Sequence, residues 1–108
     1  MALQVAELGY QLIEELRPLV ESIRRRDRSL ADQLQRAASS ICLNIAEADY
    51  SDAGNQRSRF FTAAGSASES KAALRVAIGW RHISPPDAEA AAALLERILA
   101  MLWKLTRR

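Results

Sequence analysis

Apolar residues recur every three or four positions along almost the whole chain, which is the spacing of a buried helix face. The first such stripe runs from Val5 to Ile23 and predicts a helix over residues 2–26. Pro18 interrupts this helix, and a proline removes one hydrogen bond and crowds the preceding turn. We expect a kink near residues 14–17 rather than a break, because the stripe keeps its phase across the proline.

A second helix is expected to begin near Ser29, since Ser29 and Asp32 resemble a capping box. It should end between residues 50 and 52, and Gly54 then supplies a turn. Its predicted core face consists of small and branched apolar residues: Leu30, Leu34, Ala37, Ile41, Ile45 and Ala48.

A third helix is predicted from about Gln56, and it passes through small residues around Gly65. A glycine in mid-helix costs roughly 1 kcal/mol relative to alanine, but small residues let another helix approach closely. The fourth helix has the clearest start, because Ser84 is a good N-cap and Pro85 suits the first helical position. It should reach about Leu105, and its wide apolar face favours a central position or contact with another subunit.

Short connections between the stripes imply that consecutive helices lie side by side and antiparallel. The predicted fold is therefore all-α: a single domain over residues 1–108, built as an antiparallel up-and-down four-helix bundle. Apolar residues make up 49% of the chain but aromatic residues only 6%, so the core is modest and oligomerisation is a common remedy.

The start of the chain does not resemble a secretory leader, and no apolar run approaches the ~18–20 residues of a membrane span. We expect a cytoplasmic protein with no membrane partner.

Charge is informative only through its distribution, because 15 basic and 13 acidic residues leave a net charge of +2. The antiparallel topology brings the first and third turns to one end of the bundle. Candidate nucleic-acid-binding residues there are Arg24, Arg25, Arg26, Arg28 and Arg81, beside His82. The opposite end gathers Lys104, Arg107 and Arg108, with Arg57 and Arg59 nearby.

Two interpretations of these cations stay open. Basic residues at helix C-termini complement the helix dipole and are often simply solvated. In a symmetric oligomer the same residues repeat around the axis and could follow a phosphate backbone. Trp80 and Tyr50 are the candidates for stacking on bases.

The chain lacks the usual constellations of catalytic chemistry. It has one histidine and one cysteine, so we predict no metal site, and without a glycine-rich phosphate loop we predict no cofactor. Cys42 lies among small and apolar residues and is expected to be a buried hydrophobe.

Glu47 is the carboxylate expected to be partly buried. As a general base it would need a cleft and a partner acid, so we favour a structural role over a catalytic one. We predict that Asn44 and Glu47 form a hydrogen-bonded cluster with a basic residue of the third helix, which would set the helix register. The candidates for that basic residue are Lys71, Arg57 and Arg59.

Two segments resemble the signatures of a known family. LADQLQRAASSICLNIAEA, from Leu30, is similar to "L..Q..RAA.SI..NIAEG", and RFFTAAGSASESKAAL, from Arg59, is similar to "RFL..A.GS..E....L". The closing AMLWKL resembles the pattern "ML..L". The chain departs from the family at Ala48, where glycine is usual, and in its connection with Asp49 and Asp52, whose charge would repel phosphate.

The family is that of the four-helix-bundle proteins first noticed as products of intervening sequences in 23S ribosomal RNA genes. It includes the accessory variability determinant proteins of diversity-generating retroelements. The resemblance implies a homopentameric ring, and for the retroelement members it implies binding to nucleic acid and to a reverse transcriptase.

Together, these features predict a non-enzymatic, oligomeric accessory protein. We expect it to bind RNA or other nucleic acid without sequence specificity, through arginine patches that repeat around the ring. The alternative is an oligomeric protein–protein interaction scaffold with no nucleic-acid role.

Overall fold

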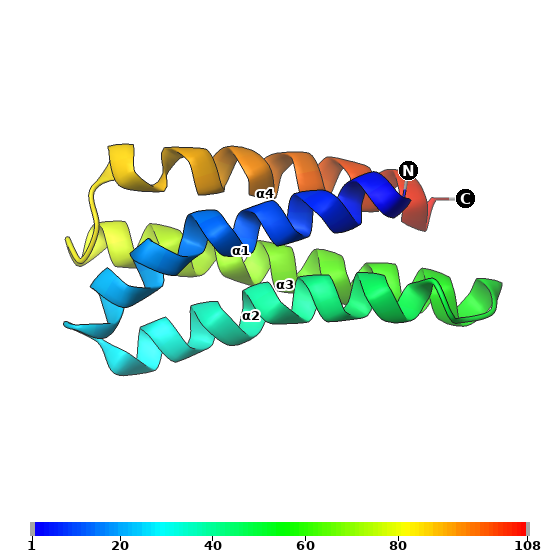
Figure 1. Ribbon diagram of the computed structural model, residues 1–108, viewed down its shortest axis with the longest axis horizontal. Helices are drawn as coiled ribbons and strands as arrows, with labels where there is room; N and C mark the ends of the chain where they lie inside the picture. Colours follow the sequence, from blue (N-terminus) through cyan, green and yellow to red (C-terminus); the bar gives the residue numbers. More distant parts are fainter. Residues whose placement is uncertain (1, 108) are drawn as a thin grey trace.

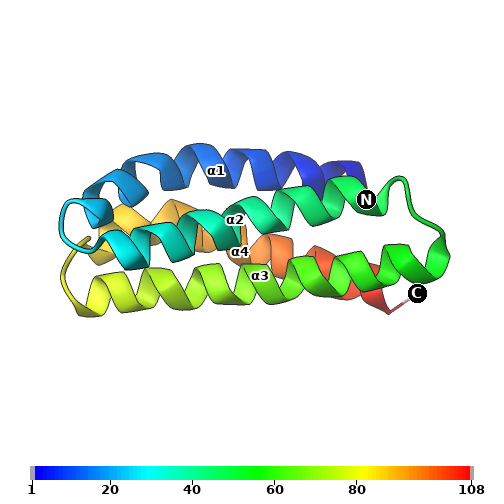
Figure 2. The ribbon, with the colours of Figure 1, turned by 90° about the horizontal axis from the view of Figure 1, so that it is seen from below.

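A computed structural model of the chain describes residues 2–107, which form four α-helices (Figure 1). Consecutive helices run in alternating directions along the long axis of a bundle that measures 42 × 22 × 19 Å (Figures 1 and 2). The prediction of an all-α, four-helix fold is confirmed. The helices are α1 (Ala2–Arg24), α2 (Arg28–Ala48), α3 (Ala53–Gly79) and α4 (Pro85–Thr106).

The helices occupy the four corners of the bundle. α1 packs against α2 and α4, and α3 packs against the same two helices, so α1 and α3 lie diagonally across the core. The α1–α2 and α3–α4 turns lie at one end of the molecule, and the α2–α3 turn lies at the other (Figure 1). We call the first of these the double-turn end.

The buried face of α1 is the predicted stripe, and Pro18 lies on its exposed side. α1 continues through Pro18 as one helix and ends at Arg24, two residues earlier than expected. Gly9 is also buried, because α2 comes very close at this point. A Cβ atom at Gly9 would lie only 3.0 Å from the Sγ of Cys42, so the absence of a side chain permits the helix contact.

The start of α2 differs from the sequence prediction. The N-cap is Asp27, whose carboxylate accepts a hydrogen bond from the Leu30 backbone N–H at 3.0 Å. Ser29 lies inside the first turn, and Asp32 pairs with Arg24 of α1 rather than closing a capping box. A carboxylate is as good an N-cap as a hydroxyl, so the earlier acid takes the position.

α3 also begins earlier than predicted. Asp52 caps it by accepting a hydrogen bond from the Asn55 backbone N–H at 3.0 Å, and Gly54 belongs to the first helical turn. The expected start at Gln56 and the expected turn at Gly54 are therefore wrong. The predicted N-cap of α4 is confirmed, because the Ser84 hydroxyl accepts a hydrogen bond from the backbone of Asp87 at 3.3 Å.

The core runs the length of the bundle and is built from aliphatic residues and alanine, together with Phe60. Leu95, Ile98 and Leu102 of α4 are fully buried, whereas Trp103 remains 46% exposed. The wide apolar face of α4 therefore divides between the core and the surface. None of the four described helices combines the length and apolarity of a membrane span.

Candidate nucleic-acid interface

The double-turn end is shaped by the way α3 terminates. The backbone N–H of His82 donates to the Ala77 carbonyl and that of Arg81 donates to the Ile78 carbonyl, each at 2.9 Å. This pair of bonds is a Schellman motif. Arg81 occupies the left-handed position, with φ of 62°, where glycine is the usual residue because it has no Cβ. The motif leaves the Arg81 side chain exposed at the tip of the turn.

A contact between the two turns holds the double-turn end together. The Nε2 of His82 lies 3.6 Å from an Asp27 carboxylate oxygen, while the other oxygen caps α2. The His82 side chain is 14% exposed, and its Nδ1 has no hydrogen-bond partner among residues 2–107. Asp27 therefore contacts both turns, so the turn that carries Arg26 and Arg28 is adjacent to the turn that carries Arg81.

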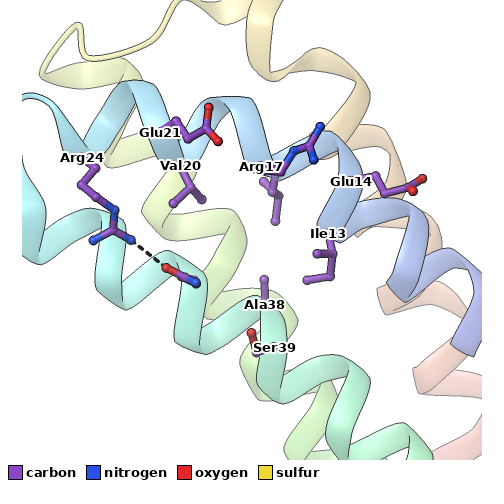
Figure 3. Close-up of a pocket in the computed structure, with 10 residues that line it drawn as sticks. Ile13, Glu14, Arg17, Val20, Glu21, Arg24, Ala38 and Ser39 are labelled. Carbon is purple, nitrogen blue, oxygen red and sulfur yellow. Dashed lines mark hydrogen bonds between the residues drawn. The ribbon is translucent and has the colours of Figure 1, made fainter.

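Arg24 differs from the other arginines predicted at this end. Its guanidinium pairs with Asp32 and donates to the Gln35 side-chain oxygen at 2.7 Å (Figure 3). The hydrogen bond from Arg24 holds the pKa of the Asp32 carboxyl below its usual value. The donors of Arg24 are thus engaged in joining α1 to α2.

The remaining predicted cations of this end stay open to solvent. They form no salt bridge within the described part of the chain, and the adjacent Trp80 is 69% exposed. Asp27 contacts His82 and Asp32 contacts Arg24, so two nearby acids are already engaged. The exposed cations are Arg25, Arg26, Arg28 and Arg81.

The opposite end also carries exposed cations. Lys104 and Arg107 are exposed there, while Arg108 lies outside the described residues. Arg57 lies over the Phe61 ring, 5.8 Å from its centroid, and Phe61 meets Trp103 edge-on at 6.2 Å. Sequence analysis missed this aromatic pair, although the four-residue spacing of Arg57 and Phe61 already indicates a contact on one helix face.

The predicted polar cluster is assembled in part. Arg59 forms an ion pair with Glu47 at 2.9 Å, and its guanidinium lies 3.4 Å from the Asn44 side-chain oxygen. Lys71 is not a member, since it pairs with Glu96 of α4. The expectation that Glu47 is partly buried is wrong, because 58% of its side chain is exposed.

The inner part of this polar contact uses hydroxyl groups that sequence analysis missed. Asn44 donates to the Ser40 carbonyl at 2.9 Å, and the hydroxyls of Ser40 and Ser66 lie 2.8 Å apart, joining α2 to α3. Small hydroxyl residues in an alanine-rich helix give little sequence signal, because they also suit a simple close contact.

An open hollow of about 590 Å³, lined mainly by apolar atoms, lies between α1 and α2. Figure 3 shows Ile13, Val20 and Ala38 pointing into it, while Glu14 and Glu21 point along the outer edge of α1. We call this hollow the α1–α2 groove.

Two further features bear on chemistry. Cys42 is half-buried, and desolvation raises the pKa of its thiol, which disfavours the reactive thiolate. Within residues 2–107, no three His, Cys, Asp or Glu side chains gather in the manner of metal ligands.

These observations define the class: a small four-helix-bundle protein with a group of exposed arginines at one end. The chain belongs to the 23S rRNA-intervening sequence protein family, whose profile matches residues 1–104. A comparison with curated proteins found no significant match.

A solved structure supports the fold. It is a crystal structure of a protein of unknown function from the S23 ribosomal protein family of Bacteroides thetaiotaomicron. It is similar to this chain with a TM-score of 0.88 and 18% identity, over 96% of this chain and 99% of the other. At that identity the likeness concerns the fold alone.

Proposed function

We propose that this protein is a cytoplasmic, non-enzymatic accessory protein that binds RNA or other nucleic acid without sequence specificity. We further propose that its antiparallel bundles assemble as a homopentameric ring. The observation that carries the proposal is the group of exposed arginines on two adjacent turns, Arg25, Arg26, Arg28 and Arg81, which form no salt bridge within residues 2–107.

The chemistry of these side chains suits a phosphate backbone. A guanidinium presents several donors in a planar fork that matches phosphate oxygens, and it stays charged at every relevant pH. Contacts of this kind supply affinity without reading the base sequence. The exposed ring of Trp80, next to Arg81, adds a surface on which an unpaired base could stack.

The backbone at Arg81 supports a functional role for that side chain. A non-glycine residue in the left-handed region is held at a cost, and such residues cluster at functional sites. Glycine would relieve the cost but would remove the cation from the tip of the turn.

Assembly would multiply a modest charge. A net charge of +2 per chain gives weak attraction, whereas several copies of one patch on a rigid ring contact the same polymer at high effective concentration. The family resemblance supports the ring, and it directs the search for a protein partner toward nucleic-acid enzymes such as a reverse transcriptase.

Salt-dependent binding tests the proposal. The logarithm of the binding constant for a structured RNA should fall linearly with the logarithm of salt concentration, with a slope of about −0.7 to −0.9 per phosphate neutralised. The double variant Arg26→Gln/Arg81→Gln should bind more weakly and show a shallower slope. Arg36→Gln/Arg97→Gln removes the same charge from exposed positions on α2 and α4 and is the matched control.

Two outcomes would count against it. No binding at low salt would favour the alternative, a protein–protein interaction scaffold with no nucleic-acid role. An equal loss in both double variants would mean that net charge, and not the double-turn end, determines binding.

A further inference from the structure

The α2–α3 and α3–α4 turns lie at opposite ends of the bundle (Figure 1), and each carries an exposed aromatic residue. Tyr50 in the first turn is 94% exposed, and Trp80 in the second is 69% exposed. Their neighbours in sequence differ in charge. Exposed Asp49 and Asp52 flank Tyr50, whereas exposed Arg81 follows Trp80. Of these two rings, Trp80 is therefore the one with a cation next to it in its turn.

Other residues hold the turn that carries Trp80. Ile83 is 6% exposed and belongs to the core, and the backbone N–H groups of Arg81 and His82 complete the Schellman motif. The backbone N–H of Trp80 donates to the Val76 carbonyl at 3.0 Å. The main chain of Trp80 is thus fixed, while its side chain contributes little to the core.

The faces of the Trp80 ring are also open. Within residues 2–107, neither a second aromatic ring nor a cation stacks on it. The other tryptophan differs, because Phe61 meets the Trp103 ring edge-on at 6.2 Å. An indole face is a large apolar surface that pairs well with another planar ring. The Trp80 ring is therefore available to a planar ligand.

The open ring shares its end of the bundle with the exposed arginines. The bundle measures only 22 × 19 Å across, so the ring and the cations of the two turns occupy one small surface. Asp87, in the first turn of α4, is an exposed acid at the same end. Four exposed cations stand against it: Arg25, Arg26, Arg28 and Arg81.

Paired and unpaired RNA would use this surface differently. In a duplex each base lies between its stacked neighbours, so guanidinium groups can reach the phosphates but an indole cannot reach the base faces. The major groove of A-form RNA is also too deep and narrow for side chains to read. An unpaired nucleotide can place its base on an aromatic ring while its phosphates contact arginines. Only an unpaired strand would use both kinds of group found at this end.

We propose that the double-turn end binds unpaired nucleotides, with a base stacked on Trp80 and the flanking phosphates held by Arg81 and the arginines of the α1–α2 turn. The inference rests on the proposed function, and it names the class of RNA: single strands, loops and ends, in preference to regular duplex. Stacking is tolerant of sequence because every base has a π face. Trp80 thus determines a preference for RNA structure, and not for RNA sequence.

The effect of Trp80→Leu on two probes tests the proposal. The probes are a single-stranded oligouridylate and an RNA duplex with the same number of phosphates. Leucine keeps an apolar side chain but has no aromatic face, so oligouridylate binding should weaken by about 5- to 100-fold. Duplex binding should not change. The salt slope should stay the same on both probes, because the loss of a stacked base changes no phosphate contact.

Two further variants serve as controls. Trp80→Phe keeps an aromatic face and should retain most of the affinity for oligouridylate. Tyr50→Leu removes the other exposed aromatic residue at a turn and should bind both probes like the unmodified protein. Circular dichroism should show unchanged helicity in all three variants, since both side chains are exposed.

Fluorescence gives an independent measurement of stacking. The chain has two tryptophans, so Trp103→Phe leaves Trp80 as the single indole and keeps an aromatic ring beside Phe61. Oligouridylate should quench the emission of Trp80 as it binds. The duplex should bind without this quenching.

The outcomes separate this inference from the proposed function. Equal effects of Trp80→Leu on the two probes, or no effect on either, would overturn the role of Trp80. The salt slope of Arg26→Gln/Arg81→Gln would still decide whether the arginines bind RNA. A shallower slope for Trp80→Leu would mean that the substitution disturbs the arginines, and it would overturn the stacking. Failure of both probes to bind at low salt would overturn this inference and the proposed function together.

Discussion

α1 and α3 stand at opposite corners of the bundle, and each has a glycine inside the helix. Gly9 of α1 is buried, and Cys42 of α2 lies where its side chain would be. Gly65 of α3 is exposed and has open space around it. The first glycine is accounted for by packing within the chain, whereas the second is not.

The surfaces of the two helices differ in the same way. α1 buries one stripe and turns charged residues such as Glu14 and Glu21 to solvent, as a surface helix should. α3 also buries one face, but the middle of its outward side is made of small residues, Gly65, Ser68 and Ala72, beside one exposed acid, Glu69. The comparison teaches that packing within one bundle can account for a buried glycine and leave an exposed one without an explanation.

The largest expected effect is at the buried glycine. Gly9→Val should lower the free energy of unfolding by about 1–3 kcal/mol, because the new side chain overpacks against Cys42. Adding Cys42→Ala should recover part of the loss. Gly65→Val is the control, since the same side chain meets nothing there. Chemical denaturation measures all three, and equal losses at both glycines would break the comparison.

A smaller change of opposite sign is expected at the exposed glycine. Gly65→Ala should raise the free energy of unfolding of the protomer by about 0.5–1 kcal/mol, through helix propensity. The measurement should be made at protein concentrations low enough to dissociate any oligomer. A destabilised protomer would mean that Gly65 has a role inside its own chain.

A substitution at the end of α3 should also raise the free energy of unfolding. Arg81→Gly relieves the left-handed conformation, which costs about 1–2 kcal/mol for residues other than glycine. Glycine also raises the conformational entropy of the unfolded chain, and this offsets part of the gain in stability. A net gain of about 0.5 kcal/mol in unfolding free energy is expected. The salt slope for RNA should become shallower by about one unit, because one cation is lost. A variant that is more stable and binds RNA unchanged would remove Arg81 from the interface.

The smallest expected effects concern the loss of stability at low pH. Asp32 of α2 holds Arg24 at the end of α1, and Asp52 caps the start of α3 by accepting a hydrogen bond from the Asn55 backbone N–H. These hydrogen bonds lower the pKa of each carboxyl from 3.8. Because each pKa is lower in the folded state, the stabilisation is present above about pH 4 and is lost as pH falls through the folded value.

Acid titrations monitored by circular dichroism test this difference. Asp32→Asn and Asp52→Asn should each make stability less dependent on pH below about 4. High salt should reduce the contribution of Asp32 more than that of Asp52, because it screens an exposed ion pair but leaves a backbone hydrogen bond in place. Equal salt sensitivity would contradict the assignment of the two causes.

Much of the fold could be predicted from periodicity, because burial of one helix face requires the spacing that the sequence displays. Val5 to Ile23 gave one buried face, and Ser84 marked the start of α4 correctly. The starts of α2 and α3 were misplaced because several residues near each turn can act as caps. The backbone conformation at each turn makes Asp27 and Asp52 the N-caps, and the sequence pattern does not reveal that conformation.

The site was harder to predict, because its charges are distributed between helices that sequence alone does not orient. Arg59 reached Glu47 as expected, but Lys71 found Glu96 on a helix outside the predicted cluster. Arg24 is held by Asp32, so one of five grouped arginines serves the bundle itself. Periodicity identifies which residues face outward, but ion pairing depends on which charged side chain of the adjacent helix lies opposite each of them.

The order of the contacts has a consequence for folding kinetics. Three of the four helix interfaces join helices that are consecutive in the chain, and only the one between α1 and α4 joins distant segments. Local contacts form quickly because little loop entropy is lost in making them. The chain should therefore fold fast, and the contacts between distant segments, namely α1 with α4 and His82 with Asp27, should form last.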